Sequence, residues 1–138
     1  MKKIVFISAL ILGFLSSYSQ EIIHLDEASF KEKVWNFDKN TSWKFEGNVP
    51  VIVDFYADWC KPCSMIAPYL VELQKEYGNK IQVYKVDVDK ITKVAQKFDI
   101  RSIPTLLFIP TSGAYTKIVG YRTKEELKTE ITSKLKVK

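Results

Sequence analysis

The sequence predicts one α/β domain in which a central five-stranded mixed sheet is flanked by four helices. The chain has 138 residues and a hydrophobic content of 46%, which is ample for a single buried core. Strand-like and helix-like segments alternate through its first half, and this order requires parallel strands joined by crossover helices. Two further strand-like segments flank a short turn in the second half, which adds an antiparallel pair.

The first nineteen residues, MKKIVFISALILGFLSSYS, have the pattern of a secretory signal peptide. A basic start is followed by the apolar run Ile4–Leu15, and small residues precede Gln20. An uncleaved membrane anchor is the alternative, but an apolar run of about a dozen residues is shorter than the roughly 20 that span a bilayer. We therefore expect a signal peptide at 1–19, cleavage near Ser19/Gln20, and an exported domain at 20–138.

The charge of the chain gives little indication of a binding partner. Removal of residues 1–19 takes away two lysines, so 21 basic and 16 acidic residues become 19 and 16, and the formal net charge falls from +5 to +3. The remaining basic residues are scattered and form no stripe interleaved with aromatic residues. We therefore expect no nucleic-acid binding.

The beginning of the domain predicts a strand, a helix and a loop. Residues 22–25 (IIHL) suit a short strand, and Asp26 can cap the helix that follows. The apolar face of that helix has helical spacing and consists of Phe30, Val34 and Phe37. The helix is expected to end near DKNTS, and 38–48 to form a loop packed by its own aromatic side chains, Trp43 and Phe45.

A central strand and a long helix follow this loop. Residues 50–56 (PVIVDFY) are almost continuously apolar, which is typical of a strand covered on both faces. A helix can run from Cys60 to Tyr77, with Pro68 inside it. Gly78 suits the left-handed position that ends such a helix.

The second half predicts a strand, a helix, a hairpin and a last helix. Residues 81–89 (IQVYKVDVD) suit a strand, and Asp89 can cap a helix that runs through Phe98. TLLFIP and YTKIVG flank the turn TSG as an antiparallel hairpin. Thr123 and Glu126 stand in capping-box spacing at the start of the last helix. The apolar face of this helix consists of Leu127, Ile131 and Leu135.

Cys60 and Cys63, the two cysteines of the chain, are compatible with three roles. A structural disulfide closing so short a loop would add roughly 2 kcal/mol, and a chain with this much core does not need it. A structural zinc site needs four Cys or His ligands, and beyond this pair the chain offers only His24. We expect neither a metal nor another cofactor, and position favours the third role, a redox-active pair.

Cys60 stands where the central strand ends and the long helix begins. Unpaired N–H groups and the positive end of the helix dipole stabilise a thiolate there, and the thiolate is the reactive form of cysteine. Cys63 lies one turn further on, close enough to attack a mixed disulfide on Cys60. One cysteine can therefore attack a substrate disulfide and the other can resolve the product.

Several motifs around this pair occur together at the spacings of one family. VDFYADWCKPC is followed by MIAP, then by YKVDVD, IRSIPT and the glycine of IVGY. On these motifs the stretch from about Ile22 to Lys136 resembles thioredoxin, and most closely the exported, periplasmic thioredoxins of bacteria that carry a signal peptide. The resemblance implies the thioredoxin fold and a monomeric protein without a cofactor.

The resemblance also implies roles for the residues of the site. Cys60 matches the attacking thiol and Cys63 the resolving thiol. Asp54 matches a buried carboxylate that helps to move the proton of the second cysteine, and burial is expected to raise its pKa. A cap or an outward-facing strand residue is the alternative for Asp54. Lys85 matches the lysine beside that carboxylate, and a solvated surface lysine is the alternative.

Substrate-binding residues follow from the same resemblance. Pro104 matches the family's cis-proline, which faces the cysteine pair, although an X–Pro bond is trans by default. Ile103 matches a residue whose backbone groups bind a substrate segment as an added strand. Trp59 is expected to form part of the apolar rim around Cys60.

The chain departs from the family pattern in two places. Lys61 and Pro62, at the substrate-facing rim between the cysteines, stand where the commonest pair is Gly-Pro. The segment before the central strand, which includes 38–48, is also longer than the usual connection.

Together these observations predict an enzyme that reduces disulfides of protein substrates by dithiol–disulfide exchange. Because the cell exterior is oxidising, a membrane or exported electron donor is expected to re-reduce it. Two alternatives stay open: an oxidant or isomerase that introduces or reshuffles disulfides, and a binding module that uses the fold and its apolar rim without catalysis.

Overall fold

The computed structural model describes residues 20–138 and confirms the predicted five-stranded mixed sheet, with strand order β1-β3-β2-β4-β5. β1 and β2 both pair parallel with β3, whereas β4 pairs antiparallel with β2, and β5 antiparallel with β4. The strands are β1 (Ile23–His24), β2 (Val51–Tyr56), β3 (Gln82–Asp87), β4 (Thr105–Ile109) and β5 (Thr116–Val119). The predicted signal peptide at 1–19 lies outside the described residues.

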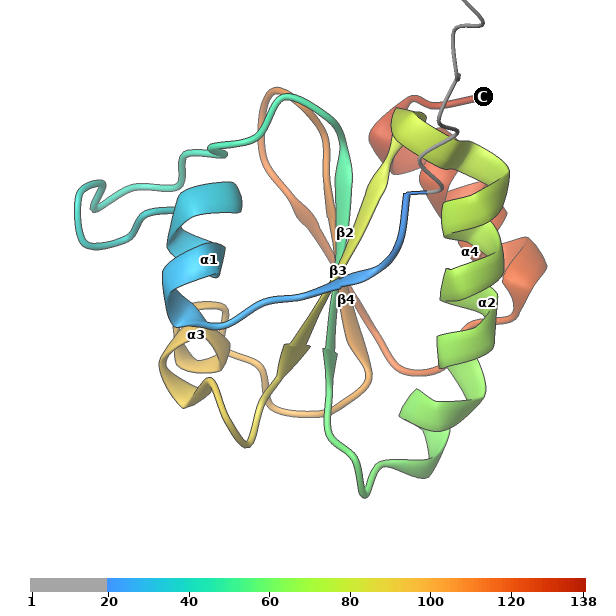
Figure 1. Cartoon of the computed structure of the whole chain (residues 1–138), viewed down its shortest axis with the longest axis horizontal. Coiled ribbons are helices and arrows are strands. Elements are labelled where there is room, and N and C mark those ends of the chain that lie inside the picture. Colours follow the sequence, from blue (N-terminus) through green and yellow to red (C-terminus); the bar gives the residue numbers. More distant parts are fainter. Residues whose placement is uncertain (1–19) are drawn as a thin grey trace, which may run out of the picture.

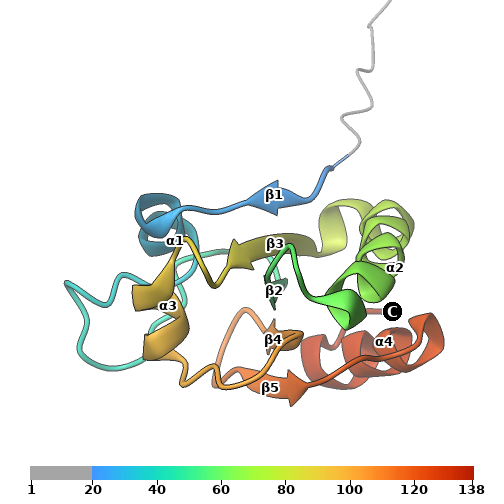
Figure 2. The same ribbon diagram turned by 90° about the horizontal axis from the view of Figure 1, so that it is seen from below.

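Helices cover both faces of this sheet, with α1 and α3 on one side and α2 and α4 on the other (Figure 1). Seen from below, the strands lie side by side in the order β1, β3, β2, β4, β5 (Figure 2). The helices are α1 (Glu27–Lys33), α2 (Lys61–Tyr77), α3 (Thr92–Lys97) and α4 (Lys124–Glu130), with a 3-10 turn at Gly78–Lys80 and a π-helical turn at Ile131–Leu135. No helix within residues 20–138 is both long and apolar enough to cross a membrane.

Each layer of helices encloses one apolar core against the sheet. Side chains of β2 alternate between the two cores because successive residues of a strand point to opposite faces. Val53 and Phe55 belong to the core beneath α1 and α3, whereas Ile52 packs in the core beneath α2 with Ile66 and Leu70. The central strand is therefore covered on both faces, as its apolar run predicts.

The register of three strands brings three polar residues into one row. Asp54 of β2 lies opposite Lys85 of β3, and Lys85 lies opposite His24 of β1. Asp54 points to the same face as Ile52, which is the face that α2 covers. An acid within the central strand is thereby placed beneath the long helix.

Side-chain caps begin two of the helices where the sequence predicts them. The Asp26 carboxylate accepts the N–H of Ser29 at 2.7 Å, at the start of α1. At the start of α4, the Thr123 hydroxyl accepts the N–H of Glu126 at 3.3 Å, and the Glu126 carboxylate accepts the N–H of Thr123 at 2.7 Å. Gly78, with φ of 54°, ends α2 in the positive-φ region that glycine tolerates.

The predicted extent of α1 is wrong. The helix ends at Lys33, and Val34 leaves the helical region with φ of −120°. The N–H groups of Val34 and Trp35 both donate to the carbonyl of Phe30, which closes the last turn and directs Trp35 into the core. Phe37 is buried but lies beyond the helix. Helical spacing misled here because a loop that folds back can bury the same residue.

Residues 38–48 form a loop, as predicted, but both of its aromatic residues, Trp43 and Phe45, pack against the core beneath α1 and α3. A Cβ atom on Gly47 would lie 2.5 Å from Cζ of Phe45, so this glycine leaves room for the Phe45 ring. Trp43 packs outside the loop. Its aromatic neighbours are Trp35, Phe98 and Tyr115, at ring-centroid distances of 5.6, 5.9 and 4.8 Å.

The predicted cap of α3 is also wrong. The helix begins at Thr92 and no side chain caps it. The turn before it is organised by Asp87, whose carboxylate accepts the N–H of Asp89 at 3.0 Å and whose carbonyl accepts the N–H of Ile91 at 2.9 Å. The Asp89 side chain is therefore available for another contact.

Candidate active site

Cys60 joins β2 to α2 and caps the helix with its own sulfur. It is the N-cap residue of α2, and its Sγ accepts the N–H of Cys63 at 3.3 Å. After reduction, a thiolate at this position faces the same N–H and the positive end of the helix dipole. The predicted location of Cys60 at the start of the helix is confirmed.

A disulfide joins Cys60 to Cys63, whose Cα atoms lie 5.3 Å apart. Both residues are nearly buried, with 5% and 3% of their surface exposed. The structure is therefore that of the oxidised protein, in which the two sulfurs are bonded to each other.

Three chain segments pack around the disulfide. They contribute Tyr56 and Ala57 at the end of β2, Val88 after β3 and Ile103 before β4. The N–H of Val88 donates to the carbonyl of Tyr56 at 2.9 Å and so fastens the ends of β2 and β3 together. Sequence reasoning missed Ala57 and Val88. The parallel order of the two strands was the available signal, because parallel neighbours end at the same edge of a sheet.

The segment before β4 presents an unused backbone edge beside this cluster. The Ile103–Pro104 peptide bond is cis, and the Pro104 carbonyl accepts the N–H of Gly120 at 2.8 Å. Within residues 20–138, no turn or loop hydrogen bond uses the N–H or carbonyl of Ile103. This residue can therefore offer both groups to a bound chain.

Trp59, Lys61 and Pro62 lie exposed on either side of Cys60. Trp59 has 72% of its surface accessible to solvent, yet its ring is held in place because Nε1 donates to the Asp89 carboxylate at 2.8 Å. Asp89 is the residue that the sequence assigned to a helix cap. The rim thus comes from the segments that follow β2 and β3, which only strand pairing brings together.

Asp54 is fully buried beside Lys85, and the alternatives of a cap or an outward-facing residue are excluded. Nζ of Lys85 lies 3.3 Å from Oδ2 of Asp54, and neither carboxylate oxygen has a hydrogen bond of good geometry within residues 20–138. Burial raises the pKa of Asp54 to about 6, and the Lys85 ammonium opposes this rise. Near neutral pH the carboxylate is therefore mostly ionised but close to the pH at which it accepts a proton.

Side chains suited to metal binding do not gather in the described part of the chain. Residues 20–138 contain no group of three or more His, Cys, Asp and Glu side chains that could hold an ion. His24 lies at the edge of the sheet, with Nδ1 3.2 Å from the hydroxyl of Tyr56.

Several known proteins with similar sequences are described as thioredoxins. A family model described as Thioredoxin matches residues 21–133. A thioredoxin of Borreliella burgdorferi is 42% identical over 99 residues, which cover 72% of this chain and 85% of that protein. A thioredoxin of Haemophilus influenzae is 37% identical over 107 residues, which cover 78% and 91% of the two chains. A chloroplastic M-type thioredoxin of Spinacia oleracea is 46% identical over 91 residues, 64% of this chain and 50% of that protein.

Proposed function

The chain belongs to the thioredoxin family and is a protein-disulfide reductase; from this premise we propose that it is an exported thioredoxin that reduces disulfides of exported proteins. The observation that carries the proposed chemistry is the position of Cys60 as the N-cap of α2, with its sulfur on the N–H of Cys63. Export is proposed from the signal-peptide pattern of residues 1–19.

Reduction proceeds by two exchanges that together transfer two electrons. The Cys60 thiolate attacks one sulfur of a substrate disulfide, which forms a mixed disulfide and releases the other substrate sulfur as a thiolate. Cys63 then loses its proton and attacks the Cys60 sulfur. This step forms the Cys60–Cys63 bond and releases the second substrate thiolate, so the substrate is reduced and the enzyme is oxidised.

Asp54 is the proposed acceptor of the Cys63 proton. It lies on the sheet face that α2 covers, and its pKa of about 6 makes it a base near neutral pH. Lys85 stabilises the ionised form of Asp54 from 3.3 Å. Lys85 is therefore proposed to set how readily Asp54 takes up and gives back the proton.

Substrate is proposed to bind along the segment before β4. The unused N–H and carbonyl of Ile103 can pair with an extended peptide as an added strand, next to Pro104. Trp59, Lys61 and Pro62 form the exposed rim around the disulfide. This binding mode recognises the backbone of the substrate more than its side chains, which suits an enzyme that acts on many protein disulfides.

Two cysteine variants test the proposed roles. Cys60→Ser is expected to abolish catalysis of insulin reduction by dithiothreitol, because the thiolate at the start of α2 is lost and the remaining thiol, Cys63, is nearly buried. Cys63→Ser is expected to accumulate mixed disulfides with substrates, which can be isolated from cells under non-reducing conditions. Capture of substrates by Cys60→Ser and not by Cys63→Ser would reverse the assigned roles. Wild-type protein without activity in the insulin assay would support a binding module.

The reduction potential separates a reductant from an oxidant. We expect a value nearer the about −270 mV of thioredoxins than the about −120 mV of strong oxidants. Lys61→Gly is expected to change the potential by no more than about 20 mV, because an exposed charge interacts weakly with a nearby thiolate. An equilibrium titration against glutathione that placed the wild type above about −160 mV would support the oxidant.

Export and re-reduction are tested in cells. Fractionation together with N-terminal sequencing is expected to find a mature chain that starts near Gln20 outside the cytoplasm. Because that compartment is oxidising, a membrane or exported electron donor is proposed to keep part of the population reduced. A full-length cytoplasmic chain would contradict the proposed export without affecting the proposed exchange chemistry.

A further inference from the structure

Two side chains, those of Asp54 and Tyr56, stabilise the charged form of Lys85. Its Nζ lies 3.3 Å from the Asp54 carboxylate and 4.2 Å from the centroid of the Tyr56 ring. The side chain of Lys85 is only 12% exposed, so the contact between ammonium and ring is largely shielded from water. The ring face thus covers the ammonium while the carboxylate binds it.

The Tyr56 ring is itself held in place by the first strand. Its hydroxyl lies 3.2 Å from Nδ1 of His24, and the two rings meet edge to face with centroids 5.9 Å apart. His24 lies directly opposite Lys85 in the pairing of β1 with β3. Tyr56, two residues beyond Asp54 on β2, therefore reaches diagonally across Lys85 to the strand on its far side.

A pocket of about 310 Å³ lies beside these residues and offers Lys85 other positions. Its lining includes Lys85, Tyr56 and His24 as well as the carboxylate-bearing residue Asp87, but not Asp54. Asp87 stands two residues after Lys85 on the same face of β3. Without a restraint, the flexible lysine could leave Asp54 for water or for the carboxylates of the pocket.

We propose that Tyr56, fixed by His24, is a positioning residue that keeps the Lys85 ammonium on the Asp54 carboxylate. The proposal rests on the role proposed above for Asp54 as the proton acceptor of Cys63. Tyr56 also packs against the cluster of Ala57, Cys60 and Cys63, but in the proposed role it acts through Lys85 and not on the sulfurs. Its contribution is to keep Asp54 ionised near neutral pH, so that the carboxylate can accept the Cys63 proton.

Other charged groups face the same pocket and must stay constant in any test. Asp87 faces it from β3, and Asp58 follows β2 close enough to act on Tyr56. The starts of α1 and α3 add Asp26, Glu27, Lys90 and Lys93. Substitution of Tyr56 by an uncharged residue leaves all of these charges unchanged, so a shift in the pKa of Asp54 then reports either the position of Lys85 or the loss of the ring itself.

The test follows the Asp54 carboxyl carbon by NMR during a pH titration of the oxidised protein, in which the disulfide cysteines do not titrate. Tyr56→Leu, which removes the ring, is expected to raise the pKa of Asp54 by about half a pH unit or more, a roughly threefold change in its ionisation ratio. Tyr56→Phe keeps the ring face and is expected to restore most of the difference. His24→Ala is expected to produce a smaller rise.

A second background separates positioning from a direct effect of the ring. In Lys85→Met protein, the Tyr56→Leu substitution is expected to leave the pKa of Asp54 unchanged, because no ammonium remains to be positioned. An equal rise with and without Lys85, or no rise in Tyr56→Leu, overturns the proposal. If Tyr56→Leu does not fold, an unchanged pKa of Asp54 in His24→Ala, at the exposed edge of the sheet, overturns it.

The same experiment distinguishes this proposal from the proposed function. The pKa of Asp54 in the oxidised protein depends on neither substrate nor export. Unchanged insulin reduction by Asp54→Asn across the pH range would remove Asp54 from the mechanism, whereas the titrations would still decide whether Tyr56 positions Lys85.

Discussion

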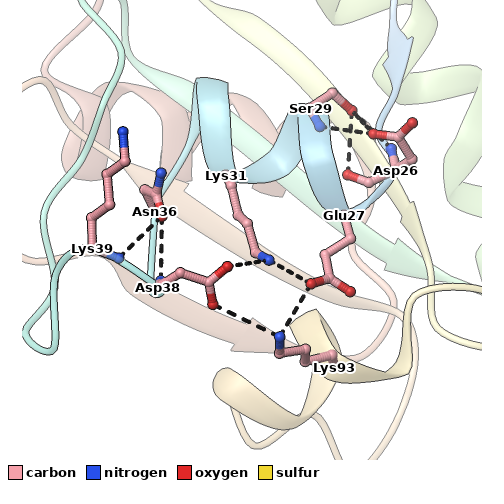
Figure 3. Close-up of polar contacts among 8 residues, drawn as sticks. All are labelled: Asp26, Glu27, Ser29, Lys31, Asn36, Asp38, Lys39 and Lys93. Carbon is pink, nitrogen blue, oxygen red and sulfur yellow. Dashed lines mark hydrogen bonds and ion pairs between the residues drawn. The ribbon is translucent and has the colours of Figure 1, made fainter.

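Lysine meets carboxylate in two very different regions of this protein. In the sheet, the buried pair of Lys85 and Asp54 lies beneath α2. On the surface, where α1, α3 and the start of the loop meet, four charges form a second group (Figure 3). This surface group consists of Glu27, Lys31, Asp38 and Lys93.

Lys31 is the centre of the surface group. Its Nζ lies 2.6 Å from Glu27 and 2.5 Å from Asp38, and Lys93 approaches the same two carboxylates at 3.3 and 3.8 Å. Hydrogen bonds from Lys31 hold the pKa of Glu27 and that of Asp38 below their ordinary values. Water and salt reach every member of this group, which weakens each attraction.

The two regions therefore shift the pKa of an acid in opposite directions with the same kind of partner. At the surface, hydrogen bonds from Lys31 outweigh the small loss of solvation. In the sheet, the loss of solvation at Asp54 outweighs the attraction of Lys85. Burial thus makes the Asp54 carboxylate a base near neutral pH. The same burial lowers the free energy of unfolding in the pH range where the enzyme is proposed to work.

The largest effect is expected from Asp54→Asn. A raised pKa in the folded state means that the acid favours folding below its ordinary pKa of 3.8, and that this advantage is lost as pH rises through about 6. The free energy of unfolding of Asp54→Asn, relative to the parent, should thus increase by roughly 2 to 3 kcal/mol from about pH 3.5 to pH 7. Urea unfolding at several pH values measures it, and a flat difference would show that partners satisfy the carboxylate.

A slightly smaller effect is expected from Trp43→Ala, which tests what holds the loop next to the surface group. Trp43 is half-buried among three aromatic rings, and its Nε1 donates to the carbonyl of Gly113 at 3.2 Å. Loss of the ring should lower the free energy of unfolding by about 2 kcal/mol. Trp43→Phe, which keeps an aromatic ring, is the matched control. If urea unfolding shows a smaller loss for Trp43→Ala than for Lys31→Met, charge and not packing secures the loop.

The smallest effect on stability is expected from Lys31→Met, which keeps the apolar stem and removes the charge. Lys31→Met should have a lower free energy of unfolding than the parent at pH values above the ordinary pKa of Glu27 and Asp38. This difference should disappear as pH falls through their lowered pKa values. It should also disappear at about 1 M salt, where charges are screened within about 3 Å. Lys39→Met, at an exposed neighbouring lysine, is the control in the same unfolding series. A loss insensitive to salt would point instead to the contact of the Lys31 ammonium with the Phe37 ring, whose centroid lies 4.9 Å from Nζ.

Much of the fold could be predicted because it depends on local chemistry. Asp26 and Thr123 cap their helices because each side-chain oxygen meets an N–H three residues ahead. The apolar run around Val53 becomes the central strand because both of its faces must be covered. Cys60 stands at the start of α2 because Pro62 and the residues after it favour a helix beginning there.

Contacts between distant segments were decided by the tertiary structure alone. Asp89 binds Trp59, and not the start of α3, because the parallel pairing of β2 and β3 brings the two loops to one edge of the sheet. α1 ends at Lys33 because the core accepts Trp35 from the turn that follows. A residue pattern records which side chains prefer burial but not which segment will cover them.

The active site divides in the same way. The sequence by itself determined a reactive cysteine pair at a helix N-terminus and an acid in an apolar strand, because both depend on neighbours in the chain. The family resemblance implied Lys85 beside Asp54 but left a solvated surface lysine open, and only the tertiary structure decided between the two and showed that Tyr56 and His24 enclose Lys85. The reason is physical: these contacts depend on the register of three strands, and a shift of one residue would turn each side chain to the opposite face.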